Sequence, residues 1–492
     1  MNRGIVLFSL VFSLYVFTLA PTYLWSDSAK LAIYVHEKVF TSPGLGAHSG
    51  HAVLGYLFSL LPLPPAYSQN LMSALFGALT ALLLYRLLCL HVDHKIAFLC
   101  SLAFSVSHLF WLYSVINETY SLLTFFIVLI LYLCFKSLEK PRRLYIIVLV
   151  LSFAYTNHAS IVLIIPGCLI LLWQPVIYRF VTGRNGLLLP VFAVIGTAHV
   201  FLIPLLQGIN IFSSATDDVS GVLNVFWQGP AQMMSQIPRY PFYLLYQFPT
   251  LGVPLGIWGA LILFKIHRRY ALATFAIWIV YVLFATQYFL QRLFPLLIPS
   301  FLIFSIWIAF GISELTSRFK TEKRPWLPVT LFVVLCVLPP GIYYASYRIA
   351  ESKKVGLEFV RRLPYRNNYR YYLFPPKHDE WGARRFVEDA FKQADSDAII
   401  LADFNPAMAL QYAQKVLNQR PDINIQLMDF WINSYTDPAR EILIHIRGNI
   451  AAGKSVYLAD NWEPYYFVSS LSHEFALTQN GGPLWKVTPV SQ

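Results

Sequence analysis

Long apolar runs separated by short polar breaks are the feature that most constrains the fold of this chain. A run of about 20 apolar residues is long enough to cross a lipid bilayer as a helix. Only 13% of the 492 residues are charged, too few to coat a soluble protein, in which about 25% is usual. The sequence therefore excludes a purely soluble or a disordered chain and predicts a polytopic α-helical membrane protein. Eleven spans are expected, at approximately residues 5–22, 69–89, 96–113, 120–136, 143–156, 159–177, 187–206, 241–264, 270–286, 293–313 and 326–345.

The distribution of lysine and arginine predicts how these spans are oriented. With a cytoplasmic N-terminus, the loops on that side hold 16 Lys and Arg, and the opposite short loops hold only Lys30, Lys38, Arg239 and Arg292. Basic loops tend to remain in the cytoplasm, so the N-terminus is expected there and the C-terminal region outside. We interpret the first run as a retained helix rather than a signal peptide. The net charge of +12 then reflects membrane insertion, and no nucleic-acid partner is expected.

The composition changes after the last span, which predicts two domains. Residues 1–345 are expected to form the transmembrane domain, with a long first outer loop at 23–68, and residues 346–492 an extracytoplasmic α/β domain. In the latter, strands are expected at 398–402, 423–427 and 455–458, with helices at 406–418 and 441–447. The expected location is the cytoplasmic (inner) membrane of a prokaryote, or the endoplasmic reticulum membrane if the source is eukaryotic.

A phosphate-loop pattern and the five cysteines are possible sites, but neither predicts a cofactor or a metal. Residues 448–455 match the phosphate-loop pattern G-x-x-x-x-G-K-[ST], which is meaningful only between a strand and a following helix. Here a helix is expected before it and a strand after it, so we interpret it as a helix end with Gly448 as the cap. All five cysteines lie in or beside apolar runs, so neither a disulfide framework nor a zinc site is predicted.

The candidate functional residues are polar groups on the outer side. Asp27 follows the first span, and His48 and His51 follow in a glycine-rich turn. Asp is a favoured helix N-cap, so the local sequence alone favours Asp27 as the cap of a helix over 28–40. The two histidines could likewise be solvated loop residues.

Three more segments complete this set. Glu118 lies in the aromatic stretch 110–120, Asn157 and His158 interrupt an apolar stretch, and Arg292 precedes a span on the side poor in basic residues. An aromatic belt with a polar turn explains the first equally well, and a hydrogen-bonded hairpin turn explains the second nearly as well. A guanidinium on this side is expected to bind an anion, so Arg292 predicts a partner such as a lipid phosphate or a buried carboxylate. Because topology places all of these segments on one face, they predict one site.

The order of these pieces resembles the GT-C superfamily of polyprenol-phosphate-dependent glycosyltransferases. More specifically, it is similar to a large bacterial family that includes the vertebrate transmembrane O-mannosyltransferase. The likeness is carried by Leu19-Ala20-Pro21 with Trp25 to Lys30 ("LAP…DSGE"), His48 to Phe58 ("HPPG-H/Y-P…LG-LF"), Asn70 to Ala78, Phe110-Trp111 with Glu118 to Tyr120 ("FW…EVY"), and Thr156-Asn157-His158 ("TNH"). Lys30 stands where the family pattern has an acid, and Ala29 where it has glycine.

This resemblance implies a function and a role for each candidate residue. It implies inverting transfer of a sugar from a polyprenyl-phosphate carrier to a protein or glycan acceptor outside the cytoplasm, without a cofactor. Asp27 would be the catalytic base, Arg292 would bind the donor phosphate, and His48, His51, Glu118, Asn157 and His158 would line the substrate pocket. No metal ligand is implied.

Two other classes of function stay open from the residues alone. The first is a transporter or flippase for a lipid-linked sugar, although such folds often repeat a broken helix and no second copy of Thr156-Asn157-His158 is present. The second is a non-catalytic membrane scaffold, which the lysine at position 30 favours. The long polar first loop with Asp27 favours the enzyme.

The predicted orientation can be tested with fusions. A reporter that is active only outside the cytoplasm should be active when fused after Gln492 and silent when fused near Glu139, because the basic loops keep the latter inside. Activity measured in intact cells decides the question. The reverse pattern would show that the topology is wrong.

Overall fold

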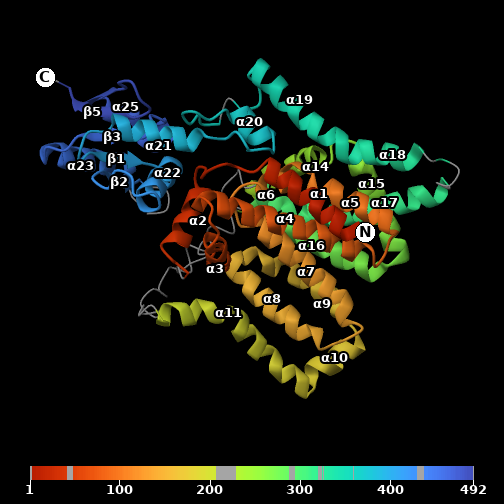
Figure 1. The fold of residues 1–492 in the computed structure, drawn as a ribbon. Helices are drawn as coiled ribbons and strands as arrows, with labels where there is room; N and C mark the ends of the chain where they lie inside the picture. The colour runs from red at the N-terminus through yellow and green to blue at the C-terminus, as the bar shows by residue number, and fades with distance from the viewer. Residues whose placement is uncertain are drawn as a thin grey trace.

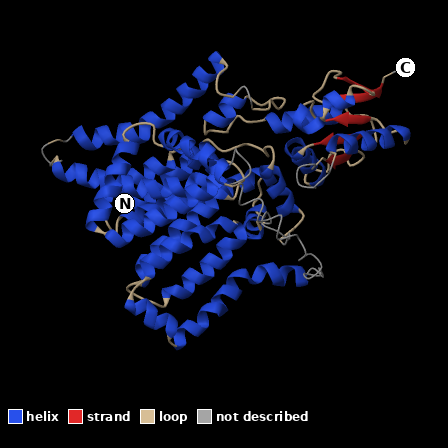
Figure 2. Cartoon of the chain, turned by 180° about the vertical axis from the view of Figure 1, so that it is seen from behind, coloured by secondary structure: helices blue, strands red, loops and turns tan. Residues whose placement is uncertain are grey.

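The computed structural model describes residues 3–40, 48–206, 229–287, 294–319, 324, 326–357, 360–428 and 437–490. Helices make up most of this part of the chain, and all its strands lie near the C-terminus (Figure 2). The helices of the first half are α1 (Arg3–Phe17), α2 (Asp27–His36), α3 (Ser49–Ser59), α4 (Pro65–Leu88), α5 (His94–Ser105), α6 (His108–Ser114), α7 (Tyr120–Ser137), α8 (Arg143–Asn157), η1 (Ala159–Ile164), α9 (Ile165–Leu172), α10 (Pro175–Thr182), η2 (Arg184–Leu188) and α11 (Leu189–Leu206).

The second half continues with helices before the sheet begins. These are α13 (Pro230–Gln236), η3 (Ile237–Arg239), α14 (Tyr240–Gln247), α15 (Gly252–Ile266), α16 (Arg268–Gln287), η4 (Phe294–Leu297), α17 (Ile298–Arg318), α18 (Trp326–Phe332), the π-helical turn η6 (Val333–Val337) and α19 (Leu338–Lys353). Helices α20 (Asn368–Leu373), α21 (Gly382–Gln393), α22 (Phe404–Lys415), α23 (Pro438–Ala451), α24 (Glu463–Tyr466) and α25 (Val468–Leu471) follow.

Several of these helices have the length and composition of membrane spans. Six are long and apolar enough, at Pro65–Leu88, Tyr120–Ser137, Arg184–Leu206, Arg268–Gln287, Phe294–Arg318 and Trp326–Lys353. Three further pairs qualify together but are bent, by 70° between α5 and α6, by 113° before α10, and by 107° between α14 and α15. The described part of the chain also has two shorter apolar helices, α1 and α8. Every predicted run therefore coincides with apolar helix, while eleven membrane crossings and their orientation stay a prediction.

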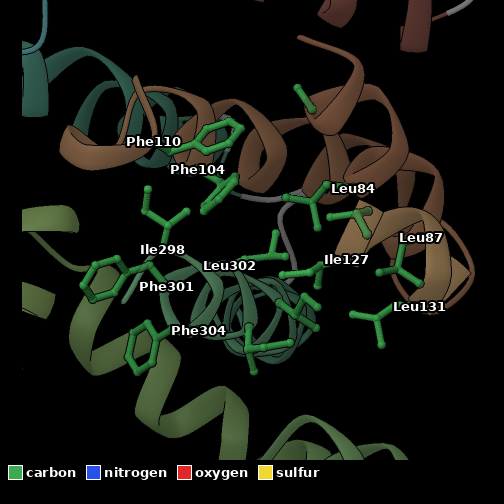
Figure 3. Close-up of a cluster of buried hydrophobic side chains, with 14 of the residues drawn as sticks. Leu84, Leu87, Phe104, Phe110, Ile127, Leu131, Ile298, Phe301, Leu302 and Phe304 are labelled. Carbon is green, nitrogen blue, oxygen red and sulfur yellow. The ribbon is translucent and has the colours of Figure 1, made fainter. Parts of the chain in front are cut away.

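Helix α17 lies at the centre of the helical part. It packs against α15, α16, α5 and α7, and every residue from Ile298 to Ile312 is buried. A helix that is apolar all round belongs inside a bundle rather than on its surface. Figure 3 shows its Ile298 and Leu302 turned toward side chains of earlier helices, among them Leu84, Phe104, Phe110 and Ile127. Its Phe301 and Phe304 stack on Tyr240 and Phe248 instead.

The chain ends in a five-stranded sheet with the order β2-β1-β3-β5-β4. Strand β1 (Ile399–Ala402) pairs in parallel with β2 (Asn424–Leu427) and β3 (Val456–Leu458). The β5 strand (Trp485–Pro489) is antiparallel to both β3 and β4 (Phe475–Thr478). The expected strand–helix–strand order is therefore present from β1 to β3, whereas β4 and β5 were not predicted. The proposed domain boundary at residue 345 falls within α19.

The phosphate-loop pattern lies between a helix and a strand, as expected, and not between a strand and a helix. Helix α23 ends at Ala451, and β3 begins at Val456. Gly448 is inside this helix, so its predicted role as the cap is wrong. Gly453, with a φ of +73°, follows the helix end instead, because glycine adopts that conformation without a steric penalty.

In Figure 1 the sheet and its helices lie at one end of the molecule, beside α2. This proximity is direct packing: α2 contacts α22, and Trp25 and Ala29 belong to the same buried cluster as Phe386 and Ile400 of the C-terminal region. The segment that carries Asp27 is thus held between the helical bundle and the sheet region.

The crossing of α15 and α17 is close enough to require glycine. A Cβ atom on Gly259 would lie 1.8 Å from the carbonyl oxygen of Trp307. We expect Gly259→Ala to lower the melting temperature in detergent, since overpacking a dense interior costs about 1–3 kcal/mol. Gly341→Ala is the matched control, because that helical position has no atom within 4 Å of the added carbon. An unchanged melting temperature in Gly259→Ala would contradict this packing.

Candidate functional site

Asp27 lies at the start of α2, just after a sharp turn of the chain. The amide of Asn70 holds this turn by donating hydrogen bonds to the carbonyl oxygens of Ala20 (2.8 Å) and Thr22 (3.1 Å). Ser26 has φ 60° and ψ −133° and occupies the N-cap position, without a side-chain capping bond. Non-glycine residues seldom adopt positive φ, and such strain persists only where the surroundings enforce it.

The alternative explanation of Asp27 as an N-cap is therefore wrong, because Asp27 is the first residue of the helix itself. Its side chain is exposed. Within the described ranges, no hydrogen bond or ion pair to its carboxylate is found. The helix N-terminus stabilises this negative charge, and the carboxylate is left available to a ligand.

Glu118 lies next to Asp27 because the loop after α6 is tied to α2. The side-chain amide of Asn117 donates to the carbonyl oxygen of Ser28, at 3.0 Å. Burial, together with the charge of Asp27, raises the pKa of Glu118 well above its usual value. Two carboxyl groups close together cannot both ionise easily, so Glu118 is the one that keeps its proton.

The two histidines of the first outer loop are packed side chains. His48 Nδ1 lies 2.6 Å from the carbonyl oxygen of Asn157 and donates to it, since a carbonyl only accepts. Burial lowers the pKa of His48, although that hydrogen bond and the Asp27 charge oppose the shift. A neutral His48 with its proton on Nδ1 has an accepting Nε2. The interpretation of His51 as solvated is wrong, because it is fully buried within α3, whereas His48 is half-buried.

Asn157 and His158 lie where α8 ends, and they connect the other segments. The Asn157 amide donates to the carbonyl oxygen of Thr119, at 3.3 Å. The His158 ring stacks on His48, with centroids 5.5 Å apart, while its Nδ1 accepts from the backbone N–H of Ser160. The predicted interruption of the apolar stretch is therefore present, as a change from α-helix to 3₁₀-helix.

The approach of α3 to the end of α8 requires glycine at position 50. A Cβ atom on Gly50 would lie 2.6 Å from Thr156 Oγ1 and 3.0 Å from the backbone nitrogen of Asn157. The glycine beside His48 thus serves close packing, and it brings the histidine against the helix end.

The structure brings together five of the seven predicted residues, and a sixth lies directly behind them. Asp27, Glu118, His48, Asn157 and His158 are linked through the contacts described above. His51 lies one helical turn further into α3, where neither ring nitrogen has a hydrogen-bond partner. Arg292 lies outside the described residues.

Sequence reasoning missed the contribution of α20. Burial raises the pKa of the Tyr371 phenol, and the Tyr246 hydroxyl of α14 donates to the carbonyl oxygen of Leu373, at 2.9 Å, which ties α20 to the helical bundle. The Arg366 guanidinium lies 5.0 Å from the centre of the Tyr371 ring. Nothing local in residues 366–373 signals this position, because it depends on how the chain returns to the bundle after α19. Over the described ranges, no group of three or more His, Cys, Asp or Glu side chains is placed to hold a metal ion.

Two solved structures of membrane proteins share the overall fold of this chain. ArnT from Cupriavidus metallidurans in its apo state superposes with a TM-score of 0.55 at 12% identity, covering 98% of this chain and 97% of that one. The oligosaccharyltransferase of Archaeoglobus fulgidus, in complex with Zn and sulfate, gives a TM-score of 0.50 at 12% identity and covers 98% and 72%. At such identity the likeness concerns the fold alone.

The family resemblance is confirmed more specifically. Residues 49–175 match the family model of the protein O-mannosyl-transferase TMEM260 N-terminal domain. This segment contains His51, Glu118, Asn157 and His158, whereas Asp27 and His48 precede it. Protein O-mannosyl-transferase tmem260 of Dictyostelium discoideum is 22% identical over 293 residues, which are 50% of this chain and 35% of that protein. The alignment thus spans about a third of that relative.

The raised pKa of Glu118 predicts a pH-dependent stability. An unfolded glutamate ionises near pH 4.3, whereas the folded one keeps its proton to higher pH. Between these two pKa values the folded state binds more protons, so its stability falls as pH rises. Glu118→Gln cannot ionise, so its melting temperature should exceed that of the wild type near pH 7 and match it near pH 4.

The control is Glu139→Gln. The hydrogen bond from Lys136 lowers the pKa of this exposed carboxyl, which is the opposite shift, so this variant should not gain stability near neutral pH. A Glu118→Gln difference that is constant from pH 4 to 8 would contradict the assignment.

Proposed function

We propose that this protein is a membrane glycosyltransferase that moves a sugar from a polyprenyl-phosphate donor to a protein or glycan acceptor outside the cytoplasm. Its transmembrane part would be residues 1–345, and residues 346–492 would lie on the acceptor side. The observation that carries the proposal is the exposed Asp27 carboxylate beside Glu118, where four segments of the chain converge. The O-mannosyltransferase named among its relatives makes mannose the first sugar to test.

Asp27 would act as the general base. The acceptor hydroxyl gives its proton to the Asp27 carboxylate while its oxygen forms a bond to the anomeric carbon. The bond from that carbon to the phosphate oxygen breaks, and its electron pair leaves with the polyprenyl phosphate. Attack opposite the leaving group inverts the anomeric centre. The base must lie within hydrogen-bond reach of the acceptor, which suits an exposed carboxylate that no protein group occupies.

Glu118 and His48 would orient the sugar rather than transfer protons. A protonated Glu118 can donate a hydrogen bond to a sugar hydroxyl, and the free Nε2 of His48 can accept one. Two carboxyl groups with separated pKa values serve different roles in a site of this kind. Asn157 and His158 would line the same pocket, and His51 would support it from within α3.

The donor would be held by its phosphate. Arg292 is the residue proposed for this contact, because a guanidinium binds phosphate through two parallel hydrogen bonds. ArnT bound to undecaprenyl phosphate shares the fold with a TM-score of 0.51, which supports a lipid-linked phosphate as the donor group. No further cofactor is proposed.

The proposal is tested by two substitutions of Asp27. Asp27→Asn keeps the shape but cannot accept the proton, so we expect transfer to fall by about 10²–10⁴-fold. Asp27→Ala should be equally inactive. The measurement is transfer from a polyprenyl-phosphate sugar by purified protein, with the melting temperature of each variant recorded alongside.

Asp93→Asn is the matched control, because Asp93 caps α5 through the Lys95 N–H and Asn caps about as well as Asp. It should keep full activity. An active Asp27→Asn variant would remove Asp27 as the base. If the wild type transfers sugar from no polyprenyl-phosphate donor, the enzyme proposal itself fails.

A further inference from the structure

The helix that carries Asp27 is too short to hold its own position. Helix α2 has 10 residues and no side-chain cap, and isolated helices of this length are marginal in water. Its position must therefore come from tertiary packing. The aromatic residues just before it supply part of this packing, since Tyr23 lies 4.3 Å from Tyr412 and Trp25 lies 5.3 Å from Phe386, measured between ring centres.

Helix α22 runs along the whole length of this segment. The Tyr412 hydroxyl accepts a hydrogen bond from the backbone N–H of Ala66, at 3.1 Å. At the far end of α2, Lys415 forms an ion pair with Glu37, at 2.9 Å. Helix α22 thus contacts the residues just before α2, the residue at its C-terminal end, and the start of α4.

Lys30 contacts the first residue of α22. It lies three residues after Asp27, so both side chains lie on the same face of the helix. Its ammonium lies 5.4 Å from the ring centre of Tyr34 and 5.6 Å from that of Phe404, the first residue of α22. Both distances are within the range of a cation–π interaction. No ion pair of Lys30 with a carboxylate is found among the residues that the structure describes.

The start of α22 is itself rigidly anchored. Asp403 caps the helix through the Asn405 N–H, at 3.2 Å. The same side chain accepts a hydrogen bond from the Tyr466 hydroxyl (2.7 Å) and pairs with the Arg361 guanidinium (2.8 Å). Asp403 and Arg361 are both almost fully buried, and removing one partner of a buried ion pair is strongly destabilising, so this pair holds the start of α22 in place. Phe404 is therefore a fixed reference point for Lys30.

We propose that Lys30 is a positioning residue, through which α22 of the C-terminal region fixes the orientation of α2 and of the Asp27 carboxylate. Among the described residues, no hydrogen bond or ion pair orients the Asp27 carboxylate, so its direction depends on the backbone of α2. The lysine that departs from the family pattern then has a reason to be there: the cation bridges α2 to an aromatic ring on α22. The effect on sugar transfer rests on the proposed function, whereas the effect on the position of α2 does not.

The test compares variants of the two partners in the full-length protein. Lys30→Met and Phe404→Leu each remove the cation–ring contact, so we expect kcat for sugar transfer to fall roughly 2- to 30-fold, with KM for the donor unchanged. The conservative variants Lys30→Arg and Phe404→Tyr keep the contact and should restore kcat. The double variant should be no worse than either single one, because both remove the same interaction.

Hydrogen exchange of the α2 backbone amides supplies a readout that does not depend on activity. Exchange should accelerate in Lys30→Met and Phe404→Leu and return to the wild-type rate in Lys30→Arg and Phe404→Tyr. Lys486→Met is the matched control, because it removes a corresponding lysine–ring contact with Tyr457 on the sheet, at 5.6 Å. It should change neither kcat nor the exchange of α2.

Three outcomes would overturn the positioning role. One is unchanged kcat and unchanged exchange in Lys30→Met. Another is a rise in KM alone, which would mean that Lys30 binds a substrate charge directly. The third is additive loss in the double variant. If the wild type transfers no sugar while α2 exchange still responds as expected, the proposed function fails and the structural link between α22 and α2 stands.

Discussion

The site depends on backbone carbonyl groups that accept hydrogen bonds from side chains of other segments of the chain. Irregular backbone beside a membrane is costly unless its polar groups are satisfied within the protein. Three asparagine side chains provide the donors: Asn70 for the turn after α1, Asn117 for the first turn of α2, and Asn157 for the loop before α7. His48 closes the series by donating to the carbonyl oxygen of Asn157. Each bond joins segments distant in the sequence, so together they determine where the two carboxyl groups lie.

The sequence predicted the apolar helices well, because hydrophobic length is a local property. It did not predict the bends at the α5–α6 and α14–α15 junctions, which depend on packing within the bundle. Strands β1 to β3 were predicted from short apolar runs. The β4 and β5 strands were missed because both are short and their burial does not alternate regularly.

The candidate site could be predicted as a set of residues but not as a geometry. Topology alone placed Asp27, Glu118 and His158 on one face, and the structure brings them together. The sequence could not separate a cap from a free carboxylate at position 27, since that depends on where the helix begins. It also gave no signal for the position of α20. Nor did it indicate the contact of Lys30 with Phe404, because these two residues are more than 300 positions apart in the chain.

The protonation of the site has an electrostatic consequence. With Glu118 protonated and His48 neutral, Asp27 and Lys30 are the opposite charges at the start of α2, and their fields largely cancel at a distance. An anion that approaches this face meets little net repulsion, whereas a second ionised carboxylate would raise a barrier against it. The proton retained by Glu118 therefore leaves this face with one negative charge fewer than two ionised carboxyl groups would give it.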